Sequence, residues 1–159
     1  MADRTADKIY DSAPNAGVGS YIIADGVSIG IGALVQLQGG YLNHWDETDQ
    51  FVGIFLGGDD RLGDGVYTGE TSDTKPPRGR VDESGVIIRH IAVAGTATQA
   101  KVGDLVYCAD SDLANVTLTD TTNPPVGWLR EFRSASDCDI QLFSANEWKA
   151  GDAGAAWAS

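Results

Sequence analysis

Basic residues are scarce in this sequence. Lysine and arginine supply 11 of the 159 residues against 23 aspartates and glutamates, which gives a formal net charge of −12. Binding to a phosphate backbone or to anionic lipid needs many exposed cations, so we expect neither nucleic acid nor a membrane as a partner. The sequence also lacks an apolar run of the roughly 18 residues needed for a transmembrane helix, and its first residues lack the apolar core of a signal peptide. We therefore expect synthesis in a cytoplasm.

Cysteine is also rare, with Cys108 and Cys138 as the only two. Two cysteines cannot form a dense disulfide framework, so we expect reduced thiols. Cys138 stands between Asp137 and Asp139, whose negative charges should raise the pKa of its thiol and disfavour the nucleophilic thiolate. Cys108 falls in an apolar stretch and is interpreted as a small core residue.

Catalytic and metal-binding patterns are missing too. His44 and His90 fall within predicted strands, without metal-ligand spacing or a nucleophile motif. The acidic stretch 59–70 suggests a calcium loop, but Arg61 and Gly63 occupy its third and fifth positions, where carboxylates are needed. A weak calcium site there stays open as an alternative. We predict that the protein is not an enzyme and needs no cofactor or metal.

Glycine is abundant, with 20 residues, and short apolar stretches separated by turn residues predict a mostly β fold. Two short segments of the sequence recur. Residues 32–37 (GALVQL) match 103–108 (GDLVYC), and residues 51–56 (FVGIFL) match 125–130 (PVGWLR), at an offset larger by three. Each copy contains a Gly-led strand, a polar turn, a second strand and a Val-Gly strand, which together describe a small β-meander.

We interpret the copies as two related β-meander units, about residues 21–56 and 86–132, within one β-domain over residues 21–143. Residues 86–94 form the longest apolar run and are predicted to be a central strand. The acidic groups at 46–49 and 110–112 are assigned to equivalent turns of the two units.

Three segments lie outside the repeated units. Residues 1–20 are predicted to be an extended arm, and residues 57–84 a long loop or an irregular hairpin. The loop holds the only basic cluster of the chain, suited to an acidic or polar partner surface; its cations are Lys75, Arg78 and Arg80. The tail, residues 144–159, is either a short helix or extended. It carries two large indoles that need cover from the domain or from a neighbour, and we name both as candidate oligomer or partner contacts: Trp148 and Trp157.

The chain resembles the capsid decoration (cement) proteins of tailed bacteriophages. The resemblance rests on residues 33–37, on 41–49 and on the strand 51–56; residues 101–106 and 126–128 resemble phrases of a wider group of small phage head proteins. It implies a compact β-barrel or β-tulip, a homotrimer, and attachment to the major capsid protein on the exterior of a mature capsid of the HK97 type.

In that family an N-terminal arm often adds a strand to a capsid sheet. With this resemblance we name candidate capsid-binding residues in the arm and in the basic loop: Ala2, Asp3, Arg4, Tyr10, Lys75, Arg78 and Arg80. The resemblance further implies localisation in the virion, stabilisation of the capsid shell, and an attachment that many weak contacts make strong.

Two alternatives stay open. The chain could be another phage structural component, of the tail, the baseplate or a head fibre. It could also be a carbohydrate-binding β-module that uses Tyr41, Trp45 and Trp128 as a stacking platform.

Overall fold

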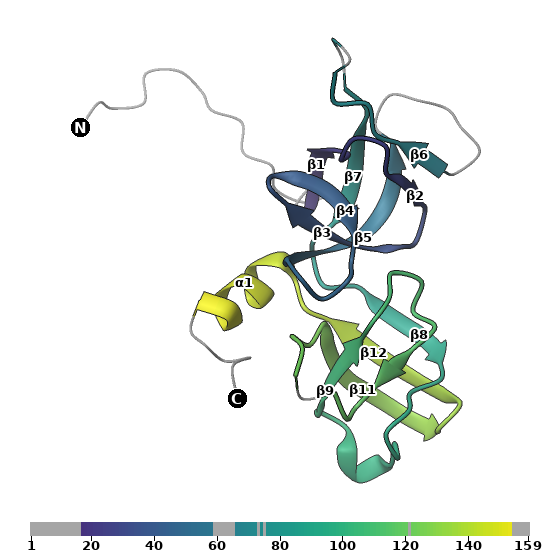
Figure 1. Ribbon diagram of the computed structural model, residues 1–159. Helices are drawn as coiled ribbons and strands as arrows, with labels where there is room; N and C mark the ends of the chain where they lie inside the picture. Colours follow the sequence, from purple (N-terminus) through teal and green to yellow (C-terminus); the bar gives the residue numbers. More distant parts are fainter. Residues whose placement is uncertain (1–16, 59–65, 73, 75, 121, 154–159) are drawn as a thin grey trace, which may run out of the picture.

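The computed structural model describes residues 17–58, 66–72, 74, 76–120 and 122–153. They form a mostly β protein with two five-stranded sheets, one two-stranded sheet and one α-helix (Figure 1). All strand pairs within the sheets are antiparallel. The elements are β1 (Val18–Ile22), β2 (Ser28–Gly30), β3 (Leu34–Gln38), β4 (Tyr41–His44), β5 (Gln50–Gly58), β6 (Val66–Thr68), β7 (Arg78–Asp82), β8 (Ile87–Ile91), the 3-10 turn η1 (Gln99–Lys101), β9 (Leu105–Cys108), β10 (Val116–Thr117), β11 (Gly127–Ser134), β12 (Asp137–Leu142) and α1 (Ala145–Ala153).

The strands form two lobes with the same topology. The first lobe, residues 17–85, contains a sheet of order β4-β3-β5-β7-β1, and the second lobe, residues 86–143, a sheet of order β10-β9-β11-β12-β8. Equivalent strands follow one another in the same order along the chain, and β2 with β6 is an addition to the first lobe. Figure 1 shows the lobes one above the other, with α1 beside their junction. The sequence repeat therefore covers three strands that are consecutive along the chain, β3 to β5 and β9 to β11, within a larger structural repeat.

The Gly-led strands of the two lobes make the same hydrogen bonds. The amide of Gly32 donates to the Phe55 carbonyl at 2.8 Å, and the amide of Gly103 donates to the Leu129 carbonyl at 2.7 Å. Both glycines have a left-handed backbone, with φ of 91° and 99°. Side chains disfavour that conformation, which explains why both copies of the repeat begin with glycine.

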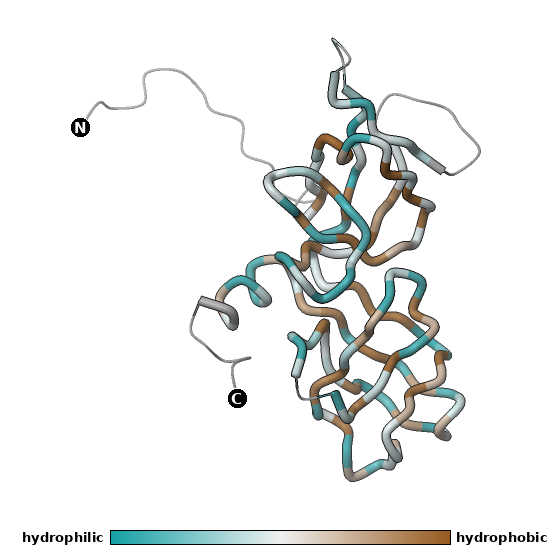
Figure 2. Tube along the Cα trace, in the orientation of Figure 1, coloured by the Kyte–Doolittle hydropathy of each residue, from teal (hydrophilic) through white to brown (hydrophobic). Residues whose placement is uncertain are grey.

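The hydrophobic core is shared between the lobes. One cluster of buried side chains lies within the first lobe, around Val35 and Phe55. The other fills the second lobe and also includes Leu34, Trp45 and other residues of the first lobe. The Trp45 indole N–H donates to the Cys108 carbonyl at 2.7 Å across the junction. Figure 2 shows hydrophobic stretches along the strands of both lobes and hydrophilic turns around them. The lobes are thus two halves of one packed scaffold.

Three predictions of local structure are wrong. The arm was expected to extend to residue 20, but β1 begins at Val18 and pairs with β7. The 57–84 loop contains β6 and also β7, which lies between β1 and β5 in the sheet. Residues 86–94 were expected to form a central strand, but β8 is the edge strand of its sheet. The alternation of polar and apolar residues that marks a strand is hard to see in β7, because one of its inward positions is occupied by glycine and not by a large apolar residue.

Each five-stranded sheet curls toward itself at one point. A single parallel bridge joins Ile23, just beyond β1, to Leu42 of β4, and the equivalent bridge of the second lobe joins Ala94 to Thr117. No closed barrel is found among the described strands.

The tail forms helix α1, one of the two predicted alternatives. The helix begins with a capping box in which the Glu147 amide donates to the Ser144 hydroxyl at 3.1 Å and the Ser144 amide donates to the Glu147 carboxylate at 2.9 Å. Within the described part of the chain, no helix has the length and apolar character needed to cross a membrane.

Candidate functional site

Two arginines of the predicted basic cluster lie on the outward face of β7. Arg78 and Arg80 are exposed, whereas Gly79 and Val81 between and beyond them are buried, as the two-residue period of a strand requires. A Cβ atom at Gly79 would lie 2.3 Å from Cε1 of Phe55. The absence of a side chain therefore lets the sheet pack against that ring and fixes the arginines outward.

The neighbouring strand β1 extends this surface. Ser20 lies opposite Arg80, and Ile22 lies opposite Arg78, so these side chains share the outward face. The Arg78 guanidinium donates to the Ser20 hydroxyl and to the Ser20 carbonyl, both at 3.1 Å. Val18, at the start of β1, is 41% exposed. We call this surface of β1 and β7, with Val18, Ser20, Ile22, Arg78 and Arg80, the arginine face.

The other predicted contact residues fall into two groups. One group lies outside the described residues: Ala2, Asp3, Arg4, Tyr10, Lys75 and Trp157. The calcium alternative at 59–70 also falls mostly outside them. Trp148 is the remaining residue, and the prediction that it contacts a partner is corrected. Its side chain is 4% exposed, it packs edge-on against Trp45 at 6.2 Å between ring centroids, and its indole N–H donates to the Pro125 carbonyl at 2.9 Å. The domain itself covers this ring.

The aromatic platform that was considered for stacking against a carbohydrate is also not formed. Trp45 is 1% exposed and belongs to the core. Trp128 is half-buried in β11 of the second lobe, with the Arg130 guanidinium 5.8 Å from its ring centroid. Tyr41 is exposed on β4 of the first lobe. These three aromatic residues therefore do not form one exposed surface for a sugar.

The sequence suggested that the acidic turn at residues 46–49 is equivalent to residues 110–112, and the structure shows that this is wrong. It joins β4 to β5, and its counterpart joins β10 to β11. In both turns an aspartate accepts a hydrogen bond from the amide two residues on: Thr48 to Asp46 at 3.2 Å and Thr122 to Asp120 at 3.0 Å. This Asx geometry explains the Asp-x-Thr pattern that the two turns share.

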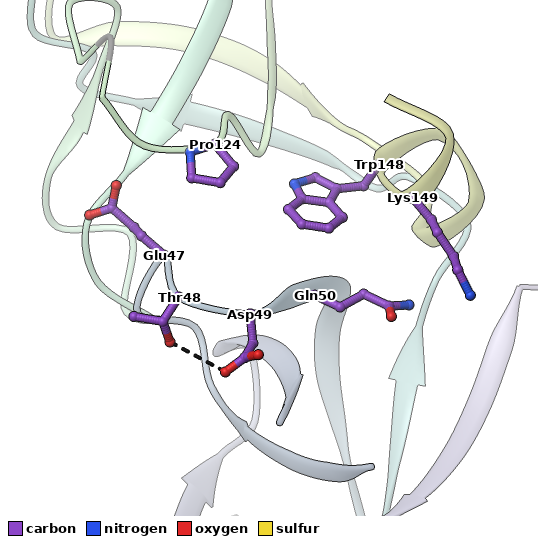
Figure 3. Close-up of a pocket in the computed structure, with 7 residues that line it drawn as sticks. All are labelled: Glu47, Thr48, Asp49, Gln50, Pro124, Trp148 and Lys149. Atoms are coloured by element: carbon purple, nitrogen blue, oxygen red, sulfur yellow. Dashed lines mark hydrogen bonds between the residues drawn. The ribbon is translucent and has the colours of Figure 1, made fainter. Parts of the chain in front are cut away.

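A pocket of about 400 Å³ lies where the lobes meet helix α1 (Figure 3). The first lobe contributes the acidic turn and the start of β5, the second lobe contributes Pro124, and the helix contributes Trp148 and Lys149. Its lining is therefore polar and acidic on the side of the first lobe, and on the other side it combines two apolar rings with one lysine. This pocket could not be predicted from the sequence, because its walls come from three separate segments.

Glu47 is the most strongly perturbed group of this region. Burial raises its pKa to about 7, and the negative charges of Asp120, Asp110 and Asp46 contribute in the same direction. Its Oε2 atom is buried, with no hydrogen-bond partner among the described residues. Its backbone is left-handed, with φ of 71°, which is uncommon for a residue with a side chain. Sequence reasoning missed Glu47 because the residues that perturb it are mostly distant in sequence.

The cysteines and histidines have structural contacts. Both cysteines are buried free thiols, as predicted. Burial raises the pKa of Cys108 to about 11 and also raises that of Cys138, where Asp137 adds to the effect. His44 lies in β4, with ring nitrogens 2.9 Å from the Ser111 hydroxyl and 2.7 Å from the Ser28 carbonyl. His90 lies in β8.

A buried carboxylate ties the edge of the second lobe together. Asp139 of β12 is 1% exposed and forms ion pairs with Arg89 and Arg133. It also accepts a hydrogen bond from the His90 amide at 3.0 Å. The Arg133 side chain holds the pKa of Asp139 near 2, so this carboxylate is ionised at neutral pH. Its donors are all in place, which makes the network a structural one.

The described residues contain no group of three or more His, Cys, Asp and Glu side chains that could hold a metal ion. No family model, curated protein or solved structure matches this chain.

Proposed function

We propose that this chain is a capsid decoration protein of a tailed bacteriophage. In this proposal it binds the major capsid protein on the exterior of a mature capsid of the HK97 type, as a homotrimer, and stabilises the shell. The observation that carries the proposal is the arginine face, where Arg78 and Arg80 are both exposed on one strand of a chain with net charge −12.

The charge pattern favours a protein partner with an acidic surface. Long-range repulsion keeps a strongly acidic chain away from anionic partners unless its few cations are concentrated on one face. β7 places two cations on one face with a two-residue spacing. Asp82, the next residue on that side, lies opposite Val18 of neighbouring β1, whose exposed side chain adds apolar area. A mixed basic and apolar surface of this kind suits a protein contact better than a sugar or a small ligand.

The scaffold supports a mechanical role. Two lobes with the same topology share one core, and the Trp45 side chain is hydrogen-bonded across their junction. A rigid body that presents a binding face, repeated many times over a shell, can stabilise the shell through individually modest contacts. The parallel bridges that curl each sheet support a barrel-like or tulip-like form for each lobe, within the same proposal.

Co-sedimentation with capsids tests the proposal. The purified chain would be mixed with expanded and with unexpanded capsids of the phage that encodes it, and pelleted protein would be quantified. We expect binding to expanded capsids, and a large loss of it in the double variant Arg78→Glu with Arg80→Glu.

The matched control is Arg130→Glu with Lys149→Glu, which changes the charge equally but away from the arginine face. It should bind as the parent does. Absence of binding to both capsid forms would reject the proposed function, and equal loss in both double variants would reject the assignment of the arginine face.

A further inference from the structure

The junction of the two lobes brings together carboxyl groups from different lobes. Glu47 lies in the turn between β4 and β5 of the first lobe, and Asp120 lies between β10 and β11 of the second. The two carboxyl groups are near enough for Asp120 to raise the pKa of Glu47. A hydrogen bond between two carboxyl groups requires a proton on one of them. Figure 3 shows the Glu47 side chain directed toward the second lobe and away from Lys149.

The distribution of donors determines which carboxyl carries that proton. Asp120 accepts hydrogen bonds from the Thr122 amide, the Thr122 hydroxyl and the Asn123 amide group, all at 3.0 Å. These bonds stabilise its ionised form. Glu47 has a buried Oε2 without any such donor among the described residues. A proton held between the two groups would therefore reside on Glu47, the one that lacks donors, with its O–H directed to the Asp120 carboxylate.

The other charged groups near Glu47 reinforce this assignment. Asp110 of the second lobe and Asp46 of its own turn both act on it with negative charge. Each has its own donors: Asn115 donates to Asp110 at 2.6 Å, and Gln36 donates to Asp46 at 2.8 Å. Across the pocket, Asp49 adds another carboxylate, and Lys149 of α1 is the only cation among the described residues of the lining. In Figure 3 the Lys149 ammonium points away from Glu47.

We propose that Glu47 and Asp120 form a proton-operated latch between the lobes. With a proton on Glu47 the pair is a hydrogen bond that holds the junction closed. When Glu47 releases that proton to solvent, two carboxylates face each other at a partly buried junction and repel. Repulsion there weakens the contacts that join the lobes, namely the hydrogen bond from Leu34 to Ser111 and that from Trp45 to Cys108.

Hydrogen exchange at these two contacts tests the latch in the full-length chain. NMR would follow the Leu34 amide and the Trp45 indole N–H at pH 5.5 and pH 8.5, as protection factors corrected for the intrinsic effect of pH. We expect both protection factors to fall about tenfold or more at the higher pH in the parent protein. Glu47→Gln keeps a donor toward Asp120 but cannot ionise, so its protection factors should be equal at the two pH values.

Glu70→Gln is the control, because Glu70 is exposed and its hydrogen bond among the described residues is a local one, from the Ser72 hydroxyl at 2.6 Å. It removes the same charge and should behave as the parent does. Direct NMR titration of the Glu47 side-chain carbon in the parent protein provides a measurement that needs no variant, and its midpoint should lie near neutrality. Constant protection in the parent, an equal fall in Glu47→Gln, or a midpoint in the ordinary range of glutamate would each overturn the latch.

Discussion

Gly53 and Gly127 hold equivalent positions in the two lobes and meet the same obstacle. A Cβ atom at Gly53 would lie 2.0 Å from the Asp82 carbonyl oxygen, and one at Gly127 would lie 2.1 Å from the Gln141 carbonyl oxygen. In each lobe the Val-Gly strand therefore approaches its neighbour, β7 or β12, too closely for any side chain. The Val-Gly motif recurs in the sequence because the same strand contact recurs in the structure.

Replacing either glycine by alanine should be strongly destabilising. The methyl group would overlap a backbone oxygen that cannot move without separating two paired strands, so we expect a loss of about 3 kcal/mol for each variant. Urea unfolding would measure it. Gly39→Asn is the control: Gly39 has φ of 59° and nothing within 4 Å of an added Cβ, and asparagine tolerates this backbone, so it should lose less than about 1 kcal/mol. Similar losses in all three variants would contradict the explanation.

Trp45 links the lobes, and its replacement by phenylalanine should weaken that link. The variant leaves the buried Cys108 carbonyl without the indole donor and leaves space beside Trp148. Both effects together should cost about 2–3 kcal/mol of unfolding free energy. Trp128→Phe affects a half-buried ring and should cost about 1 kcal/mol or less. The idea fails if the two variants are equally stable.

The position of β1 makes the end point of an N-terminal deletion critical. A deletion of residues 1–20 removes Val18, Gly19 and Ser20, which pair with Asp82, Val81 and Arg80 of β7. A deletion of residues 1–16 keeps all of β1. We expect a melting temperature several degrees lower for the longer deletion than for the shorter one, as differential scanning calorimetry would show. Equal melting temperatures would mean that this pairing contributes little.

Glu47 should make the protein less stable as pH rises. Its pKa is about 7 in the folded chain against an ordinary value of 4.5. Between these values the unfolded chain has lost the proton that the folded chain keeps, so the free energy of unfolding decreases with pH and then levels off. A shift of this size corresponds to about 3 kcal/mol at most. Because Glu47 is partly exposed, solvent screening reduces our expectation to about 1–2 kcal/mol.

Urea unfolding at pH 5 and pH 8 would test this dependence. Asp120 and Asp139 have pKa values near 2, so they stay ionised over this range and contribute no slope. The free energy of unfolding of Glu47→Gln should not decrease between the two pH values. An unchanged decrease in that variant would assign the effect to another group.

The repeat and the mostly β character could be predicted from the sequence because they depend on local patterns. Gly32 and Gly103 mark the same left-handed turn, and the strands after them alternate visibly. Helix α1 had a local signal as well, since Ser144 and Glu147 have the spacing of a capping box. The tail stayed open between helix and extended chain because it contains glycine, which disfavours a helix, as well as alanine, which favours one.

The errors came from long-range relationships. β7 was hidden because Gly79, which looks like a turn residue, fills an inward position beside Phe55. β8 looked like a central strand because its sequence is apolar, although it pairs with one neighbouring strand, β12. Glu47 could not be recognised, because Asp120 is far away in sequence and becomes its neighbour only when the two lobes pack. Physical proximity of this kind has no signature in a single sequence.

Electron cryomicroscopy of virions tests the central claim most directly. We expect this chain to form density on the outer surface of the expanded capsid, with β1 and β7 and the side chains of Arg78 and Arg80 turned toward acidic residues of the major capsid protein. Density for the chain in the tail or baseplate, or its absence from the virion, would contradict the account.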